Sequence, residues 1–485
     1  MTQASFLCGK FQDSLDLLGY EATASQARVF RELGEFFSGD DGDIFVLNGY
    51  AGTGKTTAVA AVVDALSALN VPIVLLAPTG RSAKVLASYT GRSAYTIHKH
   101  IYRQRSHGDD GFGQFSLSPN KTQGTLYVVD EVSLLGIEEG NRTSTASFGS
   151  GNLLGDLVEF VRKGVDCRLL LVGDSAQLPP VGLDASPALS EDYMAGFGGV
   201  RFGTLTEVVR QKTASGILHN ATRLRTLLCG DGFSDVSMPL DKLGLQVRGF
   251  DDIERIGGGE LLEKLSDAYG KYGEDGTIVL CRSNKRAIRY NAGIRAQVLF
   301  KEERLVRGDR LMIVKNCYQF LDDVDTLDYI ANGDMAYLVS IRHFEERYGL
   351  HFADAELCFP DYDDLEISAK VLLDTLESES ASLTYEQSNA LYLGVSEDYA
   401  HIKSKKKRYD AVREDPYFNA LQLKYAEAIT CHKSQGGQWD CVFIDNAIWQ
   451  DVVTTDDLKW LYTALTRAVR KVYLVNFKDT MFAWI

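Results

Sequence analysis

Residues 49–56 have the sequence Gly-Tyr-Ala-Gly-Thr-Gly-Lys-Thr, which fits the pattern G-x-x-x-x-G-K-[ST] in full. An apolar run at 44–47 precedes this segment directly, and a helical pattern at 57–69 follows it. Between a strand and a helix, the glycines let backbone N–H groups wrap around phosphates, and the helix N-terminus adds positive potential. The pattern predicts a nucleoside triphosphate site in which Lys55 reaches the β- and γ-phosphates and Thr56 binds Mg²⁺. We expect the nucleotide contacts to come from Gly49, Ala51, Gly52, Thr53, Gly54, Lys55, Thr56 and Thr57.

Two further apolar runs end in polar residues that suit the same site. The run at 126–129 is followed by Asp130 and Glu131. One carboxylate at a strand end can coordinate Mg²⁺ and the next can activate water, so we assign Asp130 to the metal and Glu131 to general base catalysis. Alone, such a pair would equally fit a solvated turn. The run at 169–172 precedes Gly-Asp-Ser-Ala-Gln-Leu-Pro-Pro-Val-Gly at 173–182, where the amide of Gln177 can contact the γ-phosphate.

Short runs rich in Val, Ile and Leu recur along the chain and predict buried parallel strands. They alternate with helical patterns, which is typical of βαβ units, and they fall into two blocks. We therefore predict an α/β fold with two parallel-sheet domains, the second of which is interrupted. The runs lie at 44–47, 73–76, 126–129, 169–172, 278–280, 442–444 and 472–475.

The interruption has a different pattern. Alternating apolar residues at 304–316 and 332–339, with a tight Asn332-Gly333 turn, indicate a small β-barrel. An acidic stretch at 354–379, a helical pattern at 385–395 and a basic cluster at 403–408 follow. The basic cluster fits either a solvated face or a DNA contact. We predict a first α/β domain at 1–210, a second α/β domain at 211–302 and 421–485, and an inserted barrel with a helical extension at 303–420.

Composition excludes several classes of protein. The 485 residues contain 51 Lys and Arg against 66 Asp and Glu, a formal charge of −15, which argues against a protein that coats nucleic acid or anionic membrane through net basicity. The eight cysteines form no C-x-x-C pair, so neither a zinc module nor a disulfide framework is predicted. No apolar run approaches about 18 residues, and the N-terminus lacks the pattern of an export signal. We expect a cytoplasmic protein with reduced thiols and no membrane contact.

Three later segments complete an ordered series of motifs. They are Leu-Thr-Glu-Val-Val-Arg-Gln at 205–211, Thr-Cys-His-Lys-Ser-Gln-Gly at 430–436 and Tyr-Thr-Ala-Leu-Thr-Arg-Ala at 462–468. With the three described above, they closely resemble the motifs of superfamily 1 helicases, and within these the RecD-like and Dda-like branch, superfamily 1B, of the AAA-type P-loop ATPases. The resemblance extends from about 23 to 468. It implies two RecA-like domains with ATP between them, a β-hairpin inserted in the first and an SH3-like barrel inserted in the second.

The resemblance adds residues to the nucleotide site. Gln26 matches the glutamine that contacts adenine, and Arg210 and Arg467 match the two arginines that neutralise charge developing on the γ-phosphate. We also expect Gly436 at the nucleotide. The alternatives are a surface glutamine and surface ion pairs. The catalytic set is then Lys55, Glu131, Gln177, Arg210 and Arg467, with ATP and Mg²⁺ as cofactors.

Two groups of residues match the family's contacts to the DNA backbone. Hydroxyls, amides and backbone N–H groups suit this role because they hold phosphates without identifying the base. A packed histidine is the alternative for His98. The first grip, in the first domain, comprises Pro78, Thr79, Arg81, Thr96 and His98, and the second grip, in the second domain, comprises Thr430, His432, Lys433 and Ser434.

Residues 101–120 predict a β-hairpin, because alternating residues flank a Gly/Asp-rich turn at 107–113. Members of the family carry a strand-separating pin at this position. Splitting one base-pair step costs about 1.4 kcal/mol, a load that a pin could impose as the motor pulls. An exposed hairpin without this role is the alternative.

The resemblance implies an ATP- and Mg²⁺-dependent DNA helicase that moves 5′→3′ on single-stranded DNA and unwinds forked duplex, as a monomer, in repair, recombination or replication. Two alternatives stay open. An RNA or RNA–DNA hybrid helicase would carry the same motifs, because phosphate contacts do not show whether a 2′-OH is tolerated. An ATP-switched DNA-binding subunit of a larger repair or recombination complex would also carry them.

Overall fold

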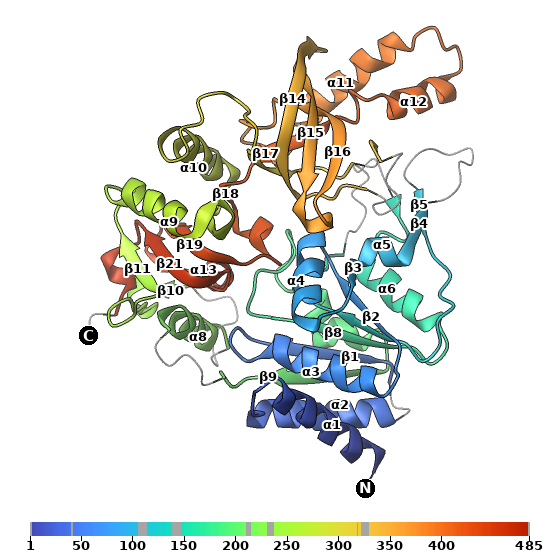
Figure 1. Cartoon of the computed structure of the whole chain (residues 1–485), viewed down its shortest axis with the longest axis vertical. Helices are drawn as coiled ribbons and strands as arrows, with labels where there is room; N and C mark the ends of the chain where they lie inside the picture. The colour runs from blue at the N-terminus through green and yellow to red at the C-terminus, as the bar shows by residue number, and fades with distance from the viewer. Residues whose placement is uncertain are drawn as a thin grey trace.

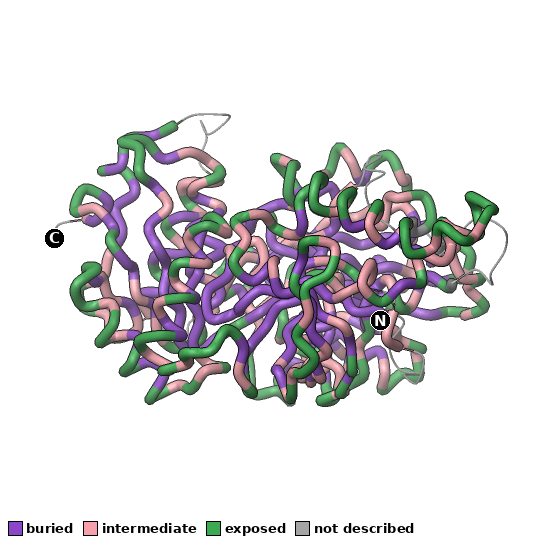
Figure 2. Tube along the Cα trace, turned by 90° about the horizontal axis from the view of Figure 1, so that it is seen from above, coloured by how far each residue is buried: buried purple, intermediate pink, exposed green. Residues whose placement is uncertain are grey.

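Two α/β lobes lie side by side in the computed structural model, with a small barrel above them (Figure 1). The structure describes residues 2–39, 42–104, 114–137, 147–209, 215–229, 237–317, 319–321 and 329–483. Buried segments form the interior of both lobes, and exposed segments surround them (Figure 2). No helix in these residues is long and apolar enough to cross a membrane.

The first lobe is built on a six-stranded sheet in the order β3-β2-β6-β8-β1-β9, and all of its strand pairs are parallel. Phe45 and Leu47 face one helical layer, whereas Ile44 and Val46 face the other. Burial on both faces explains why the strands are continuous apolar runs. The strands are β1 (Ile44–Gly49), β2 (Ile73–Ala77), β3 (Ala94–Thr96), β6 (Leu126–Val129), β8 (Arg168–Gly173) and β9 (Val200–Leu205). One layer contains α1 (Gln3–Leu17), α2 (Ala24–Ser38), α3 (Lys55–Ala68) and α4 (Gly80–Thr90), and the other contains α5 (Ile97–Ile101), α6 (Leu153–Arg162) and α7 (Glu191–Ala195).

The second lobe has a five-stranded parallel sheet in the order β11-β21-β19-β12-β18. Strand β12 precedes the barrel in the chain, yet it pairs with β18 and β19, which follow the barrel. The barrel is therefore an insertion into this lobe, as predicted. The strands are β11 (Ile253–Ile256), β12 (Thr277–Cys281), β18 (Ala428–Thr430), β19 (Trp439–Asp445) and β21 (Ala468–Val475). Helices α8 (Gly216–Cys229) and α13 (Thr455–Leu465) cover one face, α9 (Leu261–Gly276) and α10 (Asn284–Gln297) cover the other, and β10 (Met238–Pro239) pairs with β20 (Val452–Val453).

Five strands close the inserted barrel. The barrel takes in residues that the sequence analysis gave to the second lobe, because its last strand begins after the expected boundary at 420. Alternate residues of 421–425 face the barrel core. The sequence analysis ended the inserted segment after the basic cluster, because nothing in the sequence there indicates that the chain comes back to add another barrel strand. The strands are β13 (Arg310–Ile313), β14 (Met335–Arg347), β15 (Leu350–Phe359), β16 (Leu365–Leu372) and β17 (Leu421–Tyr425). The helical extension consists of α11 (Tyr385–Asp398) and α12 (Lys405–Glu414), the second of which begins in the basic cluster.

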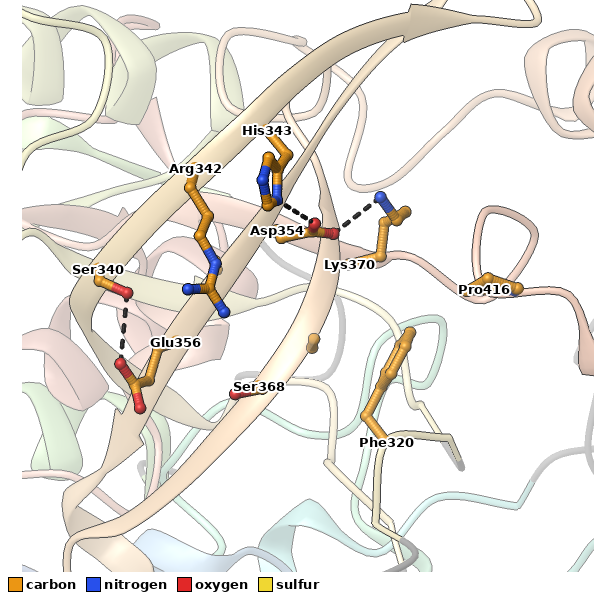
Figure 3. Close-up of a pocket in the computed structure, with 11 residues that line it drawn as sticks. Phe320, Ser340, Arg342, His343, Asp354, Glu356, Ser368, Lys370 and Pro416 are labelled. Carbon is orange, nitrogen blue, oxygen red and sulfur yellow. Dashed lines mark hydrogen bonds and ion pairs between the residues drawn. The ribbon is translucent and has the colours of Figure 1, made fainter.

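The acidic stretch at 354–379 supplies part of the barrel wall. Asp354 on β15 lies between Lys370, at 2.8 Å, and His343, at 3.0 Å, and Glu356 accepts a hydrogen bond from Ser340 at 3.3 Å (Figure 3). These side chains surround a polar hollow of about 300 Å³ on the outer face of the barrel. Several acids of this stretch are therefore paired within the barrel rather than exposed as one negative surface.

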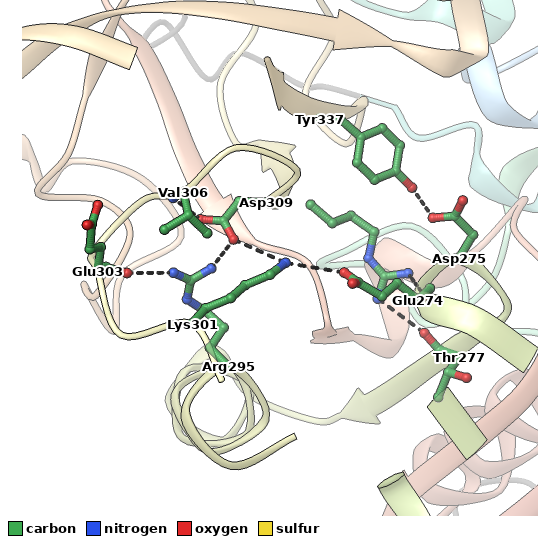
Figure 4. A network of polar contacts seen from close by, with 10 residues as sticks. Glu274, Asp275, Thr277, Arg295, Lys301, Glu303, Val306, Asp309 and Tyr337 are labelled. Atoms are coloured by element: carbon green, nitrogen blue, oxygen red, sulfur yellow. Dashed lines mark hydrogen bonds and ion pairs between the residues drawn. The ribbon is translucent and has the colours of Figure 1, made fainter. Parts of the chain in front are cut away.

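Buried ion pairs tie the barrel to the second lobe (Figure 4). Asp309, just before β13, pairs with Arg295 of α10 and with Lys301, which lies 3.3 Å away. Arg310 donates to the carbonyl oxygen of Thr277 at 3.1 Å. Both Asp309 and Arg295 are buried, and separating such a pair would leave uncompensated charges in the interior. The barrel is thus fixed to the lobe into which it is inserted.

The predicted hairpin in the first lobe has antiparallel arms. Strand β4 (Tyr102–Gln104) pairs with β5 (Gln114–Leu117), and β7 (Ser147–Phe148) adds to β5 in parallel. The hydroxyl of Tyr102 donates to Asp156 of α6 at 2.6 Å, which fixes the base of the hairpin to the lobe. The turn at 107–113 and most of the loop at 140–151 lie outside the described residues.

Candidate nucleotide and nucleic-acid sites

The phosphate loop runs from the end of β1 to the start of α3. Gly52 and Gly54 have φ values of 76° and 72°, in the left-handed region that favours glycine. Gly54 is the N-cap of α3 and Lys55 is its first residue, so the N–H groups of the first helical turn face the loop. No acidic side chain occupies this first turn. The geometry and the positive end of the helix suit a bound phosphate group.

The strand order brings three acids to this loop. Strands β6, β8 and β1 are neighbours and parallel, so Asp130, Asp174 and the loop all follow strands at the same edge of the sheet. Burial lowers the pKa of Lys55, but the charges of Glu131, Asp130 and Asp174 outweigh it and raise the pKa overall. Lys55 is therefore held as an ammonium ion beside the carboxylates.

Asp130 is held firmly in place. Its carboxylate accepts a hydrogen bond from the Tyr89 hydroxyl at 2.6 Å and another from the Glu131 N–H at 2.8 Å. Burial raises its pKa, whereas Lys55 acts in the opposite direction. A carboxylate held in this way can bind a cation with one oxygen without losing its orientation.

Glu131 and Gln177 each carry a buried oxygen that accepts no hydrogen bond from the described residues: Oε2 of Glu131 and Oε1 of Gln177. Glu131 also has left-handed backbone angles, φ 55° and ψ 37°, which are strained for a residue with a side chain. Buried polar atoms are nearly always paired, and strain of this kind concentrates at functional sites. The two oxygens mark a place where a ligand or a bound water would complete the hydrogen bonding.

A cavity of about 230 Å³ adjoins the other side of the phosphate loop. Gln26 lines this cavity directly beside the loop: a Cβ on Gly54 would lie 2.5 Å from Gln26 Nε2. The Gln26 amide donates to the Thr53 carbonyl oxygen at 3.2 Å and accepts from the Thr23 N–H at 3.0 Å. Apolar walls and a fixed amide suit a flat base such as adenine. The lining comprises Leu15, Tyr20, Glu21, Gln26, Gly52, Gly54, Thr57, Val209 and Leu218.

The second lobe contributes Arg467 to the site. Its side chain is 4% exposed, and its guanidinium donates to the carbonyl oxygens of Thr463, at 3.2 Å, and Gly437, at 3.3 Å. Its charge acts on Lys55 and lowers the pKa of that residue. Arg467 therefore lies close enough to the phosphate loop for its charge to act on Lys55, while its hydrogen bonds stay within the second lobe. Arg210, the other predicted arginine, lies outside the described residues.

Tyr462, Thr463 and Gln435 also cross the interface, and the sequence analysis assigned them no role. The Tyr462 hydroxyl accepts from the Ala51 N–H and donates to Asp174, both at 2.7 Å. The Thr463 hydroxyl accepts from the Leu178 N–H at 2.8 Å, and Gln435 donates to the Leu178 carbonyl oxygen at 2.7 Å. Their positions within the motifs at 430–436 and 462–468 were the available signal.

The first grip lies where α4 begins. The Thr79 side chain caps this helix by accepting from the Ser82 N–H at 3.2 Å. The Arg81 guanidinium lies 4.1 Å from the Trp439 ring centroid, so the helix start contacts the second lobe. Gly436, which we expect at the nucleotide, packs against the first grip: a Cβ on it would be 3.1 Å from Ser82 Cβ and 3.5 Å from Thr79 Oγ1. A family motif gives the order of residues, but not which neighbour each one meets.

The remaining first-grip residues lie at α5. Thr96 caps this helix by accepting from the Lys99 N–H at 3.3 Å. The His98 ring lies 5.7 Å from the Tyr102 ring and 6.1 Å from that of Tyr329, a residue of the inserted segment. Burial lowers the pKa of His98 to about 4, so the ring is neutral near pH 7.

The second grip follows β18. The Lys433 ammonium donates to Asn332 Oδ1 at 2.6 Å, and burial lowers its pKa to about 8. Burial also lowers the pKa of His432. Ser434 is fully buried and its hydroxyl donates to the Cys431 carbonyl oxygen at 2.7 Å, so this side chain stabilises the turn. Thr430 is the residue from which the turn begins.

The barrel meets both grips. Tyr329 and Asn332 contact His98 and Lys433 respectively. A Cβ on Gly80 would lie 2.6 Å from Tyr362 Oη, and Lys84 donates to the Pro360 carbonyl oxygen. The two grips and the barrel therefore converge at the start of α4.

Two family models match the chain in the order of its lobes. Residues 21–227 match the AAA domain model, and residues 425–475 match the model of the UvrD-like helicase C-terminal domain. Over 138 residues, 28% of its length, the chain is 38% identical to the ATP-dependent RecD2 DNA helicase of Deinococcus radiodurans. The first lobe therefore contains an AAA domain, the second lobe matches the C-terminal domain of UvrD-like helicases, and the chain is similar to a RecD-type DNA helicase.

The chain covers only part of its curated relatives. Its match spans 16% of the Deinococcus protein and 11% of an uncharacterised protein of Methanocaldococcus jannaschii, to which it is 33% identical over 148 residues. Pif1 helicase from Bacteroides, solved with ADP-AlF3 and single-stranded DNA, is 15% identical, with 95% of this chain and 94% of that chain covered and a TM-score of 0.48. Pif1 from Candida albicans is 17% identical, with 96% of each chain covered and a TM-score of 0.43.

Proposed function

We propose that this RecD-like chain is an ATP-dependent DNA helicase that moves 5′→3′ along single-stranded DNA and uses its hairpin to separate the duplex ahead. One observation carries the proposal: α13 of the second lobe is hydrogen-bonded through Tyr462 to the phosphate loop and to Asp174 of the first lobe. A nucleotide held between two lobes couples its hydrolysis to their relative movement. The Deinococcus relative named as an ATP-dependent DNA helicase supports this, and the direction rests on the family resemblance.

Within this proposal ATP is the substrate, and each residue has one task. The loop N–H groups and Lys55 hold the phosphates, Glu131 accepts a proton from the attacking water, and Gln177 contacts the γ-phosphate. Arg467, with Arg210, neutralises charge on the transferred phosphoryl group. The unpaired oxygens of Glu131 and Gln177 fit the two roles given to those side chains.

A Mg²⁺ ion fits the same residues. In the part of the chain that the structure describes, no three or more His, Cys, Asp and Glu residues gather as a metal site. Mg²⁺ in nucleotide sites usually takes one or two protein ligands and completes its shell with phosphates and water. The exposed hydroxyl of Thr56 and the carboxylate of Asp130 would hold it, and the ion would neutralise phosphate charge.

The nucleic-acid path in this proposal runs over the two grips, beneath the barrel. Thr79, Arg81 and Lys433 supply the polar and charged contacts, whereas neutral His98 would act through its ring or a neutral hydrogen bond. Few positive charges are involved, which fits a chain of formal charge −15.

Forked substrates test the proposal directly. The isolated chain is given ATP, Mg²⁺ and forks that carry either a 5′ or a 3′ single-stranded tail, with Lys55→Ala as the inactive control. We expect strand separation only with the 5′ tail. Separation only with the 3′ tail would overturn the direction. ATP hydrolysis without separation by the chain alone would favour the switched-subunit alternative, and equal activity on matched RNA forks would favour an RNA helicase.

A further inference from the structure

Tyr462 occupies an unusual place for a residue of the second lobe. It lies on α13 and is 1% exposed, yet both hydrogen bonds of its hydroxyl reach the first lobe. It accepts from the N–H of Ala51 in the phosphate loop and donates to Asp174 after β8, each at 2.7 Å. One hydroxyl therefore joins the loop and the acid across the interface.

Asp174 connects this hydroxyl to Lys55. Burial raises the pKa of Asp174, and both Lys55 and the bond from Tyr462 act against that rise. A second bond, from the Ala176 N–H at 3.0 Å, orients the carboxylate. Without the Tyr462 hydroxyl, Asp174 and the Ala51 N–H would each lose a buried partner next to the phosphate site.

Two further residues of the second lobe, one of them on the same helix, fix the loop after Asp174. Thr463, the next residue, accepts from the Leu178 N–H, and Gln435 donates to the Leu178 carbonyl oxygen. This loop also carries Gln177, with its unpaired oxygen. Docking of α13 thus places Asp174, Gln177 and the phosphate loop at the same time.

We infer that Tyr462 is a positioning residue through which docking of the second lobe orders the phosphate loop and Asp174 for ATP hydrolysis. The inference rests on the proposed ATPase function and deepens it. Arg467 on the same lobe would act on the phosphoryl group directly, whereas Tyr462 acts through Ala51 and Asp174. ATP turnover then depends on an interface that is correctly closed, not only on the presence of the arginine.

Tyr462→Phe tests the inference because it keeps the buried ring and removes only the hydroxyl. We expect kcat for DNA-stimulated ATP hydrolysis to fall about tenfold, since two hydrogen bonds at the interface are lost, while KM and the Kd of a fluorescent ATP analogue change less than about threefold. Tyr290→Phe is the matched control: it also removes a tyrosine hydroxyl bonded to a buried aspartate, Asp445 at 2.8 Å, but within one lobe. An unchanged kcat for Tyr462→Phe, or a loss confined to KM, would overturn the inference.

A double-mutant cycle separates positioning from a general loss of stability. In an Asp174→Ala background, Tyr462→Phe should lower kcat only about threefold, because the bond to Asp174 is already gone and only the bond from the Ala51 N–H is left to lose. Equal tenfold losses in both backgrounds would contradict a role through Asp174. If Tyr462→Phe does not fold, Asp174→Ala alone must still lower kcat with KM retained.

Amide hydrogen exchange tests the contact between the Ala51 N–H and the Tyr462 hydroxyl directly. In the nucleotide-free protein, Tyr462→Phe should speed amide exchange in the peptide that contains Ala51, and Tyr290→Phe should not. No difference between the two variants would overturn the contact. Absence of ATP hydrolysis by the wild-type chain would instead refute the proposed function, so the two failures are distinguishable.

Discussion

The nucleotide site and the nucleic-acid grips differ in how they are built. The nucleotide site is largely a property of one sheet edge, where β1, β6 and β8 end side by side and leave oxygens of Glu131 and Gln177 unpaired. The grips come from both lobes, and their side chains contact each other and the barrel: Arg81 stacks on Trp439, and Lys433 binds Asn332. The phosphate loop and its acids thus come from one lobe, to which the second lobe adds Tyr462, whereas the proposed nucleic-acid path depends on how three parts of the molecule sit together. Changes at the two places should have separable effects.

The largest expected effect comes from Lys55→Ala. ATP turnover should fall at least about a hundredfold, because an ammonium ion aimed at the phosphates is lost, while the affinity for single-stranded DNA should change less than about twofold. Steady-state ATPase assays and fluorescence anisotropy with an oligonucleotide measure the two quantities. Lys163→Ala, which removes a surface ion pair with Glu159, is the control. A parallel loss of DNA affinity would show that the two sites are not separable.

The substitution Glu131→Gln should have the next largest effect on ATP turnover. The amide keeps the shape of the side chain but cannot accept the proton from water, so turnover should fall about a hundredfold with ATP binding retained. Single-turnover hydrolysis with labelled ATP checks this, with Glu159→Gln as the control. Fast turnover in the Glu131 variant would assign the general base to another residue, and Asp174 would be examined first.

On the nucleic-acid side, Lys433 predicts a pH dependence. Its pKa is lowered by burial to about 8, so its positive charge is complete below that pH and is lost as the pH rises through it. If the bound strand requires the charged form, affinity for single-stranded DNA should fall by up to about tenfold between pH 7 and pH 9. Lys433→Arg should remove this dependence, because a guanidinium stays charged. If the affinity of the wild-type chain for single-stranded DNA does not change with pH, the charge of Lys433 does not contribute to DNA binding.

The smallest expected effect is that of salt concentration on the affinity for single-stranded DNA. If Arg81 and Lys433 supply most of the phosphate contacts, log K for single-stranded DNA should fall against log salt with a slope of only about −1 to −2. A slope near −5 would show that more basic side chains take part. The start of α12 is the first candidate, and replacement of Lys405, Lys406 and Lys407 by Gln should then lower the slope.

The strand-end segments of the candidate nucleotide site could be predicted from the sequence, because each one is contiguous and directly follows an apolar strand. Gly54 needs its positive φ, and Asp130 follows a buried run, so local pattern and chemistry agree. The contacts of Gly436 with Ser82 and Thr79 could not be predicted, because these neighbours lie in the other lobe. Tyr462 was missed for the same reason: its bonds join residues 411 and 288 positions apart in the sequence. The final barrel strand was also not predicted, because β17 pairs with β13, which lies more than 100 residues earlier in the chain, and no local sequence pattern indicates that pairing.

The buried ion pair between Arg295 and Asp309 limits how far the barrel can move relative to the second lobe. Removing one partner of such a buried pair costs about 3–5 kcal/mol, so the pair holds the barrel firmly to the second lobe. The links from the barrel to the first lobe are single contacts, such as Lys84 with Pro360 and Tyr329 with His98. If ATP binding moves the two lobes relative to each other, as the proposed function requires, the barrel would therefore move with the second lobe and change its position over α4.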